Sequence, residues 1–287
     1  MKSIMVNIVL GGVGIYATMV VVIYGFQRSL LYFPTLSKAS RISSRVPDMQ
    51  EIVFTTEDGL QLFAWYRKTT VSGLPTVVIF HGNAGSLADR GDKARVFLDQ
   101  GYGVMLVEYR GYGGNPGTPT ESGLMADGRA ALAALAGFGV GGRDVVLYGE
   151  SLGSGVATAM ALEARQNAAP VAALVLEAPF TSTVDVAMGR YPFLPVRWLM
   201  KDKYDSLSRM AEVKVPVLVV HGEKDHTVPV ALGKKLFAAA NQPKESVWVK
   251  DADHSDLYQY GVGARVLEFL ARTTAKGPQP QGVVPGK

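Results

Sequence analysis

The chain has 287 residues, of which 48% are hydrophobic and 19% charged, with a formal net charge of +4. This length allows one large domain or at most two small ones. No dense run of basic residues interleaved with aromatics occurs, so the sequence does not indicate binding to nucleic acid. The absence of cysteine excludes disulfides and cysteine-based metal sites, and it leaves the cellular compartment open.

The first predicted element is an apolar helix over residues 1–27. No charged residue occurs from Ile4 to Phe26, and a transmembrane helix needs about 20 mostly apolar residues. A cleaved signal peptide is the competing interpretation, but the run is longer than the usual signal core and no A-x-A-like site closes it. A buried core helix is disfavoured because the segment is apolar on all sides. The sequence therefore predicts an uncleaved single-pass membrane anchor.

The charges that flank this segment bear on its orientation. Lys2 precedes it, whereas Arg28, Lys38, Arg41 and Arg45 follow it. The positive-inside rule would keep the following domain cytoplasmic, although large domains can be translocated despite such a bias. The side of the membrane on which the domain lies stays open.

A polar linker is expected over residues 28–49, a catalytic domain over residues 50–271 and a disordered tail over residues 272–287. The domain opens with a hairpin around Glu57-Asp58-Gly59. Strands and helices then alternate, and the strands are continuous apolar runs, at residues 76–80, 103–109, 144–148, 171–176, 216–220 and 246–249. Strands without polar alternation are covered on both faces, so we expect a mostly parallel sheet flanked by helices, an α/β fold.

One segment interrupts this alternation, over residues 178–212. It is aromatic and broken by prolines, and it lies between two core strands. Insertions above strand ends shape ligand sites, so we predict a small lid-like insertion with Tyr191, Phe193 and Trp198 in the substrate pocket. The alternative is an ordinary packed crossover helix.

A G-x-S-x-G pattern occupies residues 149–153, directly after an apolar strand and before a run of helix formers. A serine in a tight turn between strand and helix is the arrangement of a nucleophile elbow. Ser151 would have a strained backbone that small flanking residues permit, and its hydroxyl would stand at a helix N-terminus. Since the five-residue pattern is common, an ordinary Gly/Ser turn is the alternative, and the remaining residues must distinguish the two.

A serine hydroxyl needs a base to remove its proton, and the base needs an acid to orient it. In this kind of fold the chain order is serine, acid, histidine, each on a loop that follows a strand. Asp225 and His254 follow two later strands in that order. Of the other three histidines, His81 and His221 end buried strands, where hydrogen bonds to loop backbone are expected, and His226 adjoins the acid in sequence, which places it awkwardly to bridge Asp225 and Ser151. For the acid, the lesser alternatives are Glu223, Asp251 and Asp253, although Asp251 and Asp253 are expected to cap the closing helix, which is predicted from Asp256 to Leu270.

The same chemistry needs two donors for an oxyanion. We expect one to be the backbone N–H of Leu152, the residue after the serine. The other would be the backbone N–H of Asn83 in the loop His81-Gly82-Asn83-Ala84-Gly85, with Ala84 as the alternative. This glycine-rich loop lacks the Gly-Lys-Ser/Thr ending of a phosphate-binding loop.

These motifs together resemble the alpha/beta-hydrolase superfamily. The resemblance rests on Ser151, Asp225 and His254, with HGNAG at residues 81–85 and GESLG at residues 149–153. The stretch YRGYG at residues 109–113, PTESGL at residues 119–124 and the N-terminal anchor make the chain similar to the membrane-anchored branch that includes alpha/beta-hydrolase domain-containing protein 13. The resemblance spans residues 28–271 and implies the fold and the triad, whereas it says little about the substrate.

The expected function is therefore that of a membrane-anchored serine hydrolase acting on carboxylic esters or thioesters through an acyl-enzyme. No metal or organic cofactor is expected, and the expected partners are a small-molecule or acylated substrate and the membrane. A serine peptidase of the same fold is one alternative, and a non-catalytic binding protein on a hydrolase scaffold is another. Acyl chain length, leaving group and oligomeric state are not determined by the sequence.

Overall fold

The structure is a computed structural model that describes residues 2–38 and 40–274. The expected disordered tail at residues 272–287 lies outside the described residues from residue 275 onward, and Thr273 still belongs to the last helix. The prediction for the remainder of the tail therefore stays a prediction.

The centre of the fold is an eight-stranded sheet in the order β10-β9-β8-β7-β4-β6-β3-β2. The strands span β2 Gln50–Thr55, β3 Gln61–Arg67, β4 Thr76–Phe80, β6 Gly103–Val107, β7 Val145–Glu150, β8 Ala173–Glu177, β9 Val217–Gly222 and β10 Lys244–Val249. The hairpin β2–β3 is antiparallel, as is the pairing of β3 with β6, whereas the pairings from β6 to β10 are parallel. The expected mostly parallel sheet is confirmed.

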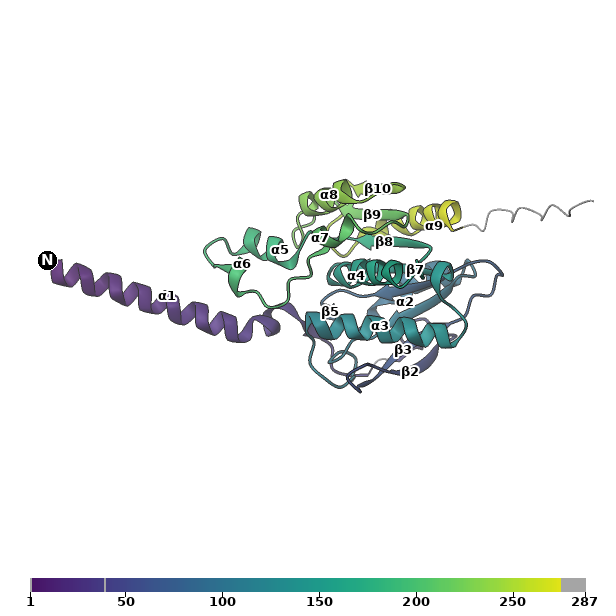
Figure 1. Ribbon diagram of the computed structural model, residues 1–287, viewed down its shortest axis with the longest axis horizontal. Helices are drawn as coiled ribbons and strands as arrows, with labels where there is room; N and C mark the ends of the chain where they lie inside the picture. Colours follow the sequence, from purple (N-terminus) through teal and green to yellow (C-terminus); the bar gives the residue numbers. More distant parts are fainter. Residues whose placement is uncertain (1, 39, 275–287) are drawn as a thin grey trace, which may run out of the picture.

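Helices cover both faces of this sheet (Figure 1). One face packs against α3 Glu121–Gly137, α4 Leu152–Gln166, α7 Ser206–Met210 and α8 Val230–Ala239, and the other against α2 Gly91–Leu98 and α9 Val262–Thr273. Alternate residues of one strand enter the two cores: Val78 and Phe80 of β4 face the first, and Val77 and Ile79 face the second. This two-sided burial explains why the central strands are apolar at every position.

Short helical turns complete the domain, at η1 Leu87–Arg90, η2 Gly142–Asp144 and η3 Leu257–Tyr260. The closing helix, expected as one piece from Asp256 to Leu270, is divided because Gly261 has a left-handed backbone with φ 77° between η3 and α9. Helix α8, which begins directly after Pro229, was not anticipated from the sequence.

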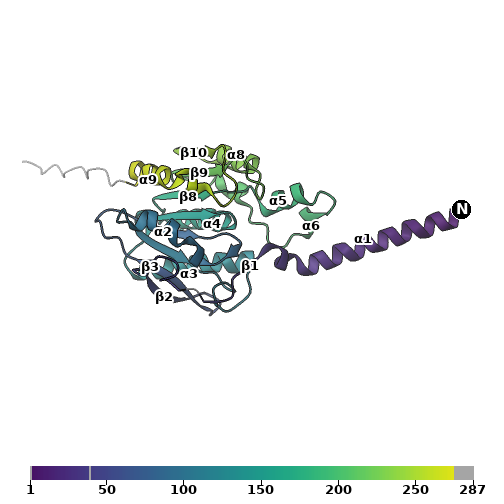
Figure 2. The same cartoon turned by 180° about the vertical axis from the view of Figure 1, so that it is seen from behind.

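The N-terminal helix α1, Lys2–Leu31, projects from the domain on the side that carries α5 Thr183–Arg190 and α6 Val196–Leu199 (Figures 1 and 2). It is long and apolar enough to cross a membrane, with a mean hydropathy of 2.2 over its most apolar window. The helix continues four residues past the expected end of the anchor at residue 27. The chain then forms β1, Phe33–Pro34, which pairs in parallel with β5, Ala84–Gly85.

The insertion over residues 178–212 consists of α5, α6 and α7 with their connecting loops. Ser182 caps α5 by accepting a hydrogen bond from the Asp185 N–H, and Asp205 caps α7 through the Ser208 N–H. Pro192 and Pro195 separate α5 from α6, and the segment contacts α1 in part rather than forming a single crossover helix. The insertion therefore builds a wall beside the carboxyl edge of the sheet.

Candidate active site

Ser151 lies directly after β7, at the turn into α4. Its backbone has φ 50° and ψ −115°, a conformation that L-residues rarely adopt and that costs about 1–3 kcal/mol. The residue is buried at 8% exposure, and its position at the start of α4 sets its hydroxyl at the positive end of a 15-residue helix. A strained serine in this position is the geometry of a nucleophile elbow.

The flanking glycines are required by close packing rather than by their own φ angles. A Cβ on Gly149 would collide with the backbone of Gly153 and Ser154, and a Cβ on Gly153 would collide with the carbonyl oxygens of Phe80 and His81. The start of α4 thus lies directly against the end of β4. This contact brings the elbow and the loop after β4 together.

Asp225, His254 and Ser151 form one continuous chain of hydrogen bonds. His254 Nε2 lies 2.9 Å from Ser151 Oγ, and His254 Nδ1 lies 2.7 Å from Asp225 Oδ2. Asp225 follows β9 and His254 follows β10, so three loops at the carboxyl edge of the sheet supply the three groups. The structure therefore brings together the three residues that the sequence analysis paired.

The carboxylate of Asp225 is fully buried and is held on both of its oxygens. Oδ1 accepts the backbone N–H groups of Thr227 and Val228 at 2.8 and 2.7 Å, and Oδ2 lies 3.1 Å from His221 Nε2. Burial raises the pKa of Asp225, but the hydrogen bonds from His221 and His254 outweigh that effect and leave the pKa well below its usual value. Asp225 is thus ionised and oriented toward His254.

His221 was expected to bond only to loop backbone. Its Nε2 lies 2.9 Å from the Val228 carbonyl oxygen as expected, but the same atom also lies near Asp225. His81 likewise contacts the Gly82 carbonyl and, in addition, the buried Glu108 at 2.9 Å. Glu108 lies after another strand, 27 residues from His81, so that contact has no local signal in the sequence, whereas Asp225 lies only four residues after His221.

The alternative acids are placed elsewhere. Asp253 accepts hydrogen bonds from the backbone N–H groups of His226 and His254 and pairs with the His226 side chain. Asp251 and Glu223 lie at the surface, paired with Lys224 and Lys234. Neither Asp251 nor Asp253 caps the closing helix, because the N-cap position of α9 is Gly261.

The expected oxyanion loop lies beside the serine and is tied to the N-terminal helix. Asn83 and Leu152 both border the cavity that contains Ser151, whereas Ala84 belongs to β5. The Asn83 side-chain amide donates to the Leu31 carbonyl oxygen at the end of α1, at 2.6 Å, and the Asn83 carbonyl accepts from the Phe33 N–H at 2.8 Å. The position of this loop therefore depends on the end of α1.

A largely buried charge network, which the sequence analysis missed, lies beneath the elbow. Glu150 pairs with Arg90 and Lys93, and Lys93 also contacts Glu177 at 2.7 Å. Burial raises the pKa of Glu150, but the charges of Lys93 and Arg90 more than compensate and hold it well below its usual value. The network joins the start of α2 to the ends of β7 and β8, so it holds the strand end that carries Ser151. No local pattern in the sequence links these residues.

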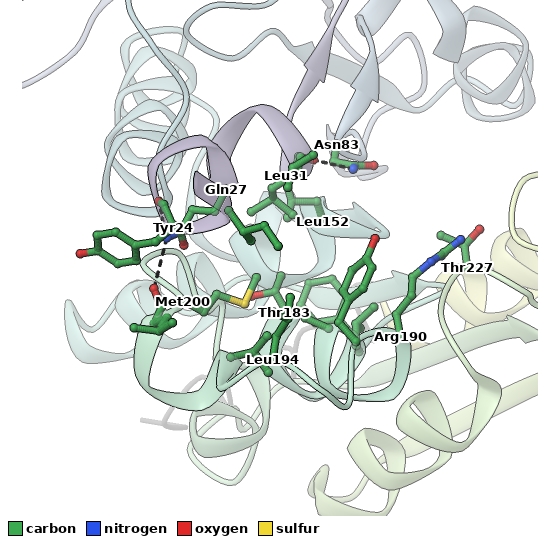
Figure 3. Close-up of a pocket in the computed structure, with 18 of the residues that line it drawn as sticks. Tyr24, Gln27, Leu31, Asn83, Leu152, Thr183, Arg190, Leu194, Met200 and Thr227 are labelled. Carbon is green, nitrogen blue, oxygen red and sulfur yellow. Dashed lines mark hydrogen bonds between the residues drawn. The ribbon is translucent and has the colours of Figure 1, made fainter. Parts of the chain in front are cut away.

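An apolar cavity of about 590 Å³ opens above Ser151. Residues of α1, of the oxyanion loop and of the insertion line it (Figure 3), including Met19, Ile23, Leu31, Asn83, Leu152, Thr183, Leu194 and Met200. Tyr191 and Phe193 border it as expected. Trp198 does not: it is 83% exposed, because Val196 and Leu199 occupy the face of α6 that turns toward the cavity. Within the described residues, no group of three or more His, Asp or Glu is arranged to hold a metal ion.

Comparison with known proteins agrees with this architecture. The sequence model of the family described as "Serine aminopeptidase, S33" matches residues 74–203. An uncharacterised protein of Mycobacterium tuberculosis is 43% identical over 236 residues, covering 82% of each chain. The alpha/beta hydrolase domain-containing protein WAV2 of Arabidopsis thaliana is 30% identical over 79% of this chain and 80% of its own length.

Among solved structures, an esterase of Pyrococcus furiosus superposes with a TM-score of 0.66 at 20% identity, covering 85% of this chain and 98% of the esterase. An alpha-beta hydrolase of Vibrio vulnificus superposes with a TM-score of 0.68 at 20% identity, covering 82% and 88%. At 20% identity, these two structures show only that the fold is shared. The 30% identity to the plant protein over most of both chains shows that the two proteins belong to one family. The chain belongs to the alpha/beta-hydrolase superfamily.

Proposed function

We propose that this hydrolase is a membrane-anchored serine hydrolase that cleaves carboxylic esters or thioesters through a Ser151–His254–Asp225 triad. The observation that carries the proposal is the unbroken hydrogen-bond chain from buried Asp225 through His254 to Ser151, which ends at the floor of an apolar cavity. A polar nucleophile at the base of an apolar cavity suits a substrate with an apolar acyl group and one reactive carbonyl.

In the proposed mechanism, Ser151 Oγ attacks the substrate carbonyl while His254 Nε2 takes its proton. Asp225 holds the imidazole and stabilises its positive charge. The N–H groups of Asn83 and Leu152 would bind the oxyanion of the tetrahedral intermediate. His254 then protonates the departing alcohol or thiol, leaving an acyl group on Ser151. A water molecule, deprotonated by His254, attacks this acyl-enzyme and releases the acid.

A serine aminopeptidase is the second candidate, favoured by the description of the matching family. Recognition of a free α-amino group calls for an acceptor such as a carboxylate. Among the described residues that line the cavity, none is acidic, and Arg190 is the single charged residue. This lining disfavours a cationic peptide end and supports the ester or thioester proposal.

Helix α1 would remain in the mature protein as an anchor and would not be cleaved as a signal segment. Removal of α1 would take away residues that line the cavity and the carbonyl that binds the Asn83 side chain. A segment that completes the cavity has a role in the mature protein.

The test uses the full-length protein with Ser151→Ala, a fluorophosphonate probe and a short p-nitrophenyl ester. The variant should lose probe labelling and at least about 10⁴-fold in kcat, as triad variants do. Ser154→Ala is the matched control, because this serine lies three residues away and its buried hydroxyl has no hydrogen-bond partner in the described part of the chain. Labelling that persists in Ser151→Ala would reject the nucleophile, and an unlabelled wild-type protein would favour a binding role.

A further inference from the structure

Helix α1 contributes one continuous face to the cavity. Between Lys2 and Gln27 the half-buried positions are Met19, Val20, Ile23 and Gln27, and all four line the cavity, whereas the remaining positions of that stretch are exposed. Spacings of three and four residues place these side chains on one side of a helix. The opposite side, which includes Val22 at 52% exposure, faces away from the domain.

Polar contacts fix this face against the insertion. The Tyr16 hydroxyl donates to the Phe193 carbonyl oxygen at 2.7 Å. The Gln27 side chain donates to the Leu199 carbonyl and accepts from the Lys201 N–H, at 3.2 and 2.8 Å. These contacts, spread over three turns of the helix, make α1 a fixed wall of the cavity rather than a flexible tether.

A second set of contacts holds the end of α1 that lies next to the domain. Arg28 forms an ion pair with the buried Asp202 at 2.8 Å, and the hydroxyls of Tyr32 and Tyr204 lie 2.9 Å apart. Asp202 also accepts the Glu121 N–H at the start of α3. The contacts of Arg28 and Tyr32 therefore lie next to the domain, and the part of α1 that precedes them in the chain is mostly apolar.

The length of the cavity can be measured along α1. From Leu31, beside Ser151 and Asn83, to Met19 at the outer end, twelve residues at a rise of about 1.5 Å span about 18 Å. The outer lining residues Met19, Val20 and Ile23 belong to the charge-free run from Ile4 to Phe26. If this run lies in a bilayer, the outer half of the cavity opens into hydrocarbon rather than water.

The insertion has the side chains expected at such a boundary. Tyr191 and Phe193 lie between α5 and α6, and Trp198 lies in α6; they are 45%, 58% and 83% exposed. Helices α5 and α6 lie on the side of the domain from which α1 projects (Figure 2). Exposed aromatic rings are costly in water but favoured at a membrane interface, where one end of each ring is apolar and the other wet. The wall opposite α1 would thus also rest at the membrane.

We propose that the substrate is a long-chain acyl ester or thioester that resides in the bilayer and reaches Ser151 laterally. Its single acyl chain lies between α1 and residues 183–200, with the reactive carbonyl at the inner end beside Asn83 and Leu152. A volume of about 590 Å³ is in the range of sites that enclose one small molecule. This inference rests on the proposed function and adds the substrate class and the route.

The test compares two valines of α1 in full-length protein reconstituted in phosphatidylcholine vesicles. Val20→Trp places a bulky ring inside the cavity, and Val22→Trp places the same ring on the opposite side of α1. The substrates are p-nitrophenyl butyrate in the water phase and p-nitrophenyl palmitate in the vesicles. Fluorophosphonate labelling counts the folded active sites, so rates are expressed per labelled site.

Val20→Trp should lower the palmitate-to-butyrate ratio of kcat/KM at least about tenfold, because each methylene excluded from an apolar site weakens binding several-fold. Leu194→Trp, from the opposite wall, should lower the ratio similarly. Val22→Trp should leave the ratio within about twofold. Adding inert phospholipid at constant total palmitate should slow palmitate hydrolysis, since it dilutes substrate within the bilayer.

The outcomes separate this inference from the proposed function. Absence of Ser151-dependent butyrate hydrolysis in the wild type would reject both. Butyrate hydrolysis with equal ratios for Val20→Trp and Val22→Trp would reject the chain path alone. A palmitate rate that does not change with added phospholipid would reject delivery from the bilayer and point to substrate taken from water.

Discussion

The two ends of the cavity are built differently. At the inner end, Ser151, Asp225 and His254 stand on loops that follow three parallel strands, and the Asp225 carboxylate and its supporting hydrogen bonds are buried. At the outer end, α1 and the insertion meet through a few polar contacts, and their apolar side chains remain largely exposed. The inner end has the rigidity that proposed acyl transfer requires, and the outer end has the apolar exposure that a membrane would cover.

This contrast assigns different roles to the two regions. Reacting groups must be held to within fractions of an ångström, which a closely packed sheet edge provides. Recognition of an acyl chain is non-directional, so a wall of apolar side chains on separate elements is sufficient. Substitutions at the inner end should therefore alter kcat for every substrate, whereas substitutions at the outer end should alter the preference among substrates.

The largest effect is expected from Asp225→Asn. Loss of the charge that orients His254 should lower kcat about 10⁴-fold for short and long esters alike. Asp251→Asn, which alters an exposed carboxylate in the loop after β10, is the control and should stay within about twofold. Steady-state kinetics with p-nitrophenyl butyrate measures both, and a loss confined to long chains would contradict the division between the two ends.

The next largest effect concerns stability. Glu150→Gln leaves Lys93 and Arg90 partly unpaired beneath the elbow, and breaking a buried ion pair costs about 3–5 kcal/mol. Urea unfolding at pH 7 should show a loss on the order of 3 kcal/mol. Lys234→Gln, which removes a surface ion pair, should cost less than about 1 kcal/mol.

The same variant has a defined pH dependence. The folded state lowers the pKa of Glu150, so its contribution to stability is complete above the usual value of 4.5 and is lost as the pH falls below it. The difference in unfolding free energy between the wild type and Glu150→Gln should therefore shrink from pH 5 downward. A difference that widens on acidification would show that the network does not hold Glu150 ionised.

A smaller effect is expected from Asn83→Ala. Asn83 belongs to the oxyanion loop at the inner end of the cavity, and its side chain bonds the end of α1. The substitution keeps the backbone N–H but removes the hydrogen bond to the Leu31 carbonyl, worth about 1 kcal/mol. We expect kcat to fall about fivefold for butyrate and palmitate, with KM nearly unchanged. An unaltered kcat would indicate that the oxyanion loop does not depend on the end of α1.

The smallest effect is expected from Trp198→Ala. This side chain lies outside the cavity, so kcat/KM for either ester in detergent should change less than about twofold. Phe193→Ala, five residues earlier and in the cavity wall, should reduce palmitate hydrolysis several-fold while butyrate hydrolysis changes less. Equal losses in the two variants would place the substrate path over the outer surface of α6 instead.

Much of the fold could be predicted because its signals are local. Each apolar run such as Thr76–Phe80 must be covered on both faces, and a strand followed by GESLG and a helical run specifies a turn at Ser151. Because a parallel sheet collects its strand ends at one edge, the loops with Asp225 and His254 were expected near that turn. Two features were harder to predict. Gly261 divides the closing helix, and α8 has no distinctive sequence signal.

By itself the sequence determined the main strands of the sheet, the position of the turn that carries Ser151 and the apolar character of residues 1–27. These features depend on periodicity and on glycine spacing, which act over only a few residues. The tertiary structure alone decided the contacts between distant segments. It set Lys93 between Glu150 and Glu177, joined Asn83 to Leu31, and turned Trp198 outward while Phe193 lines the cavity. It also made α1 a wall of the cavity above Ser151. Such contacts depend on how whole elements pack, and the contacts of Asn83 and Lys93 join residues 52 to 84 positions apart, for which the sequence has no local pattern.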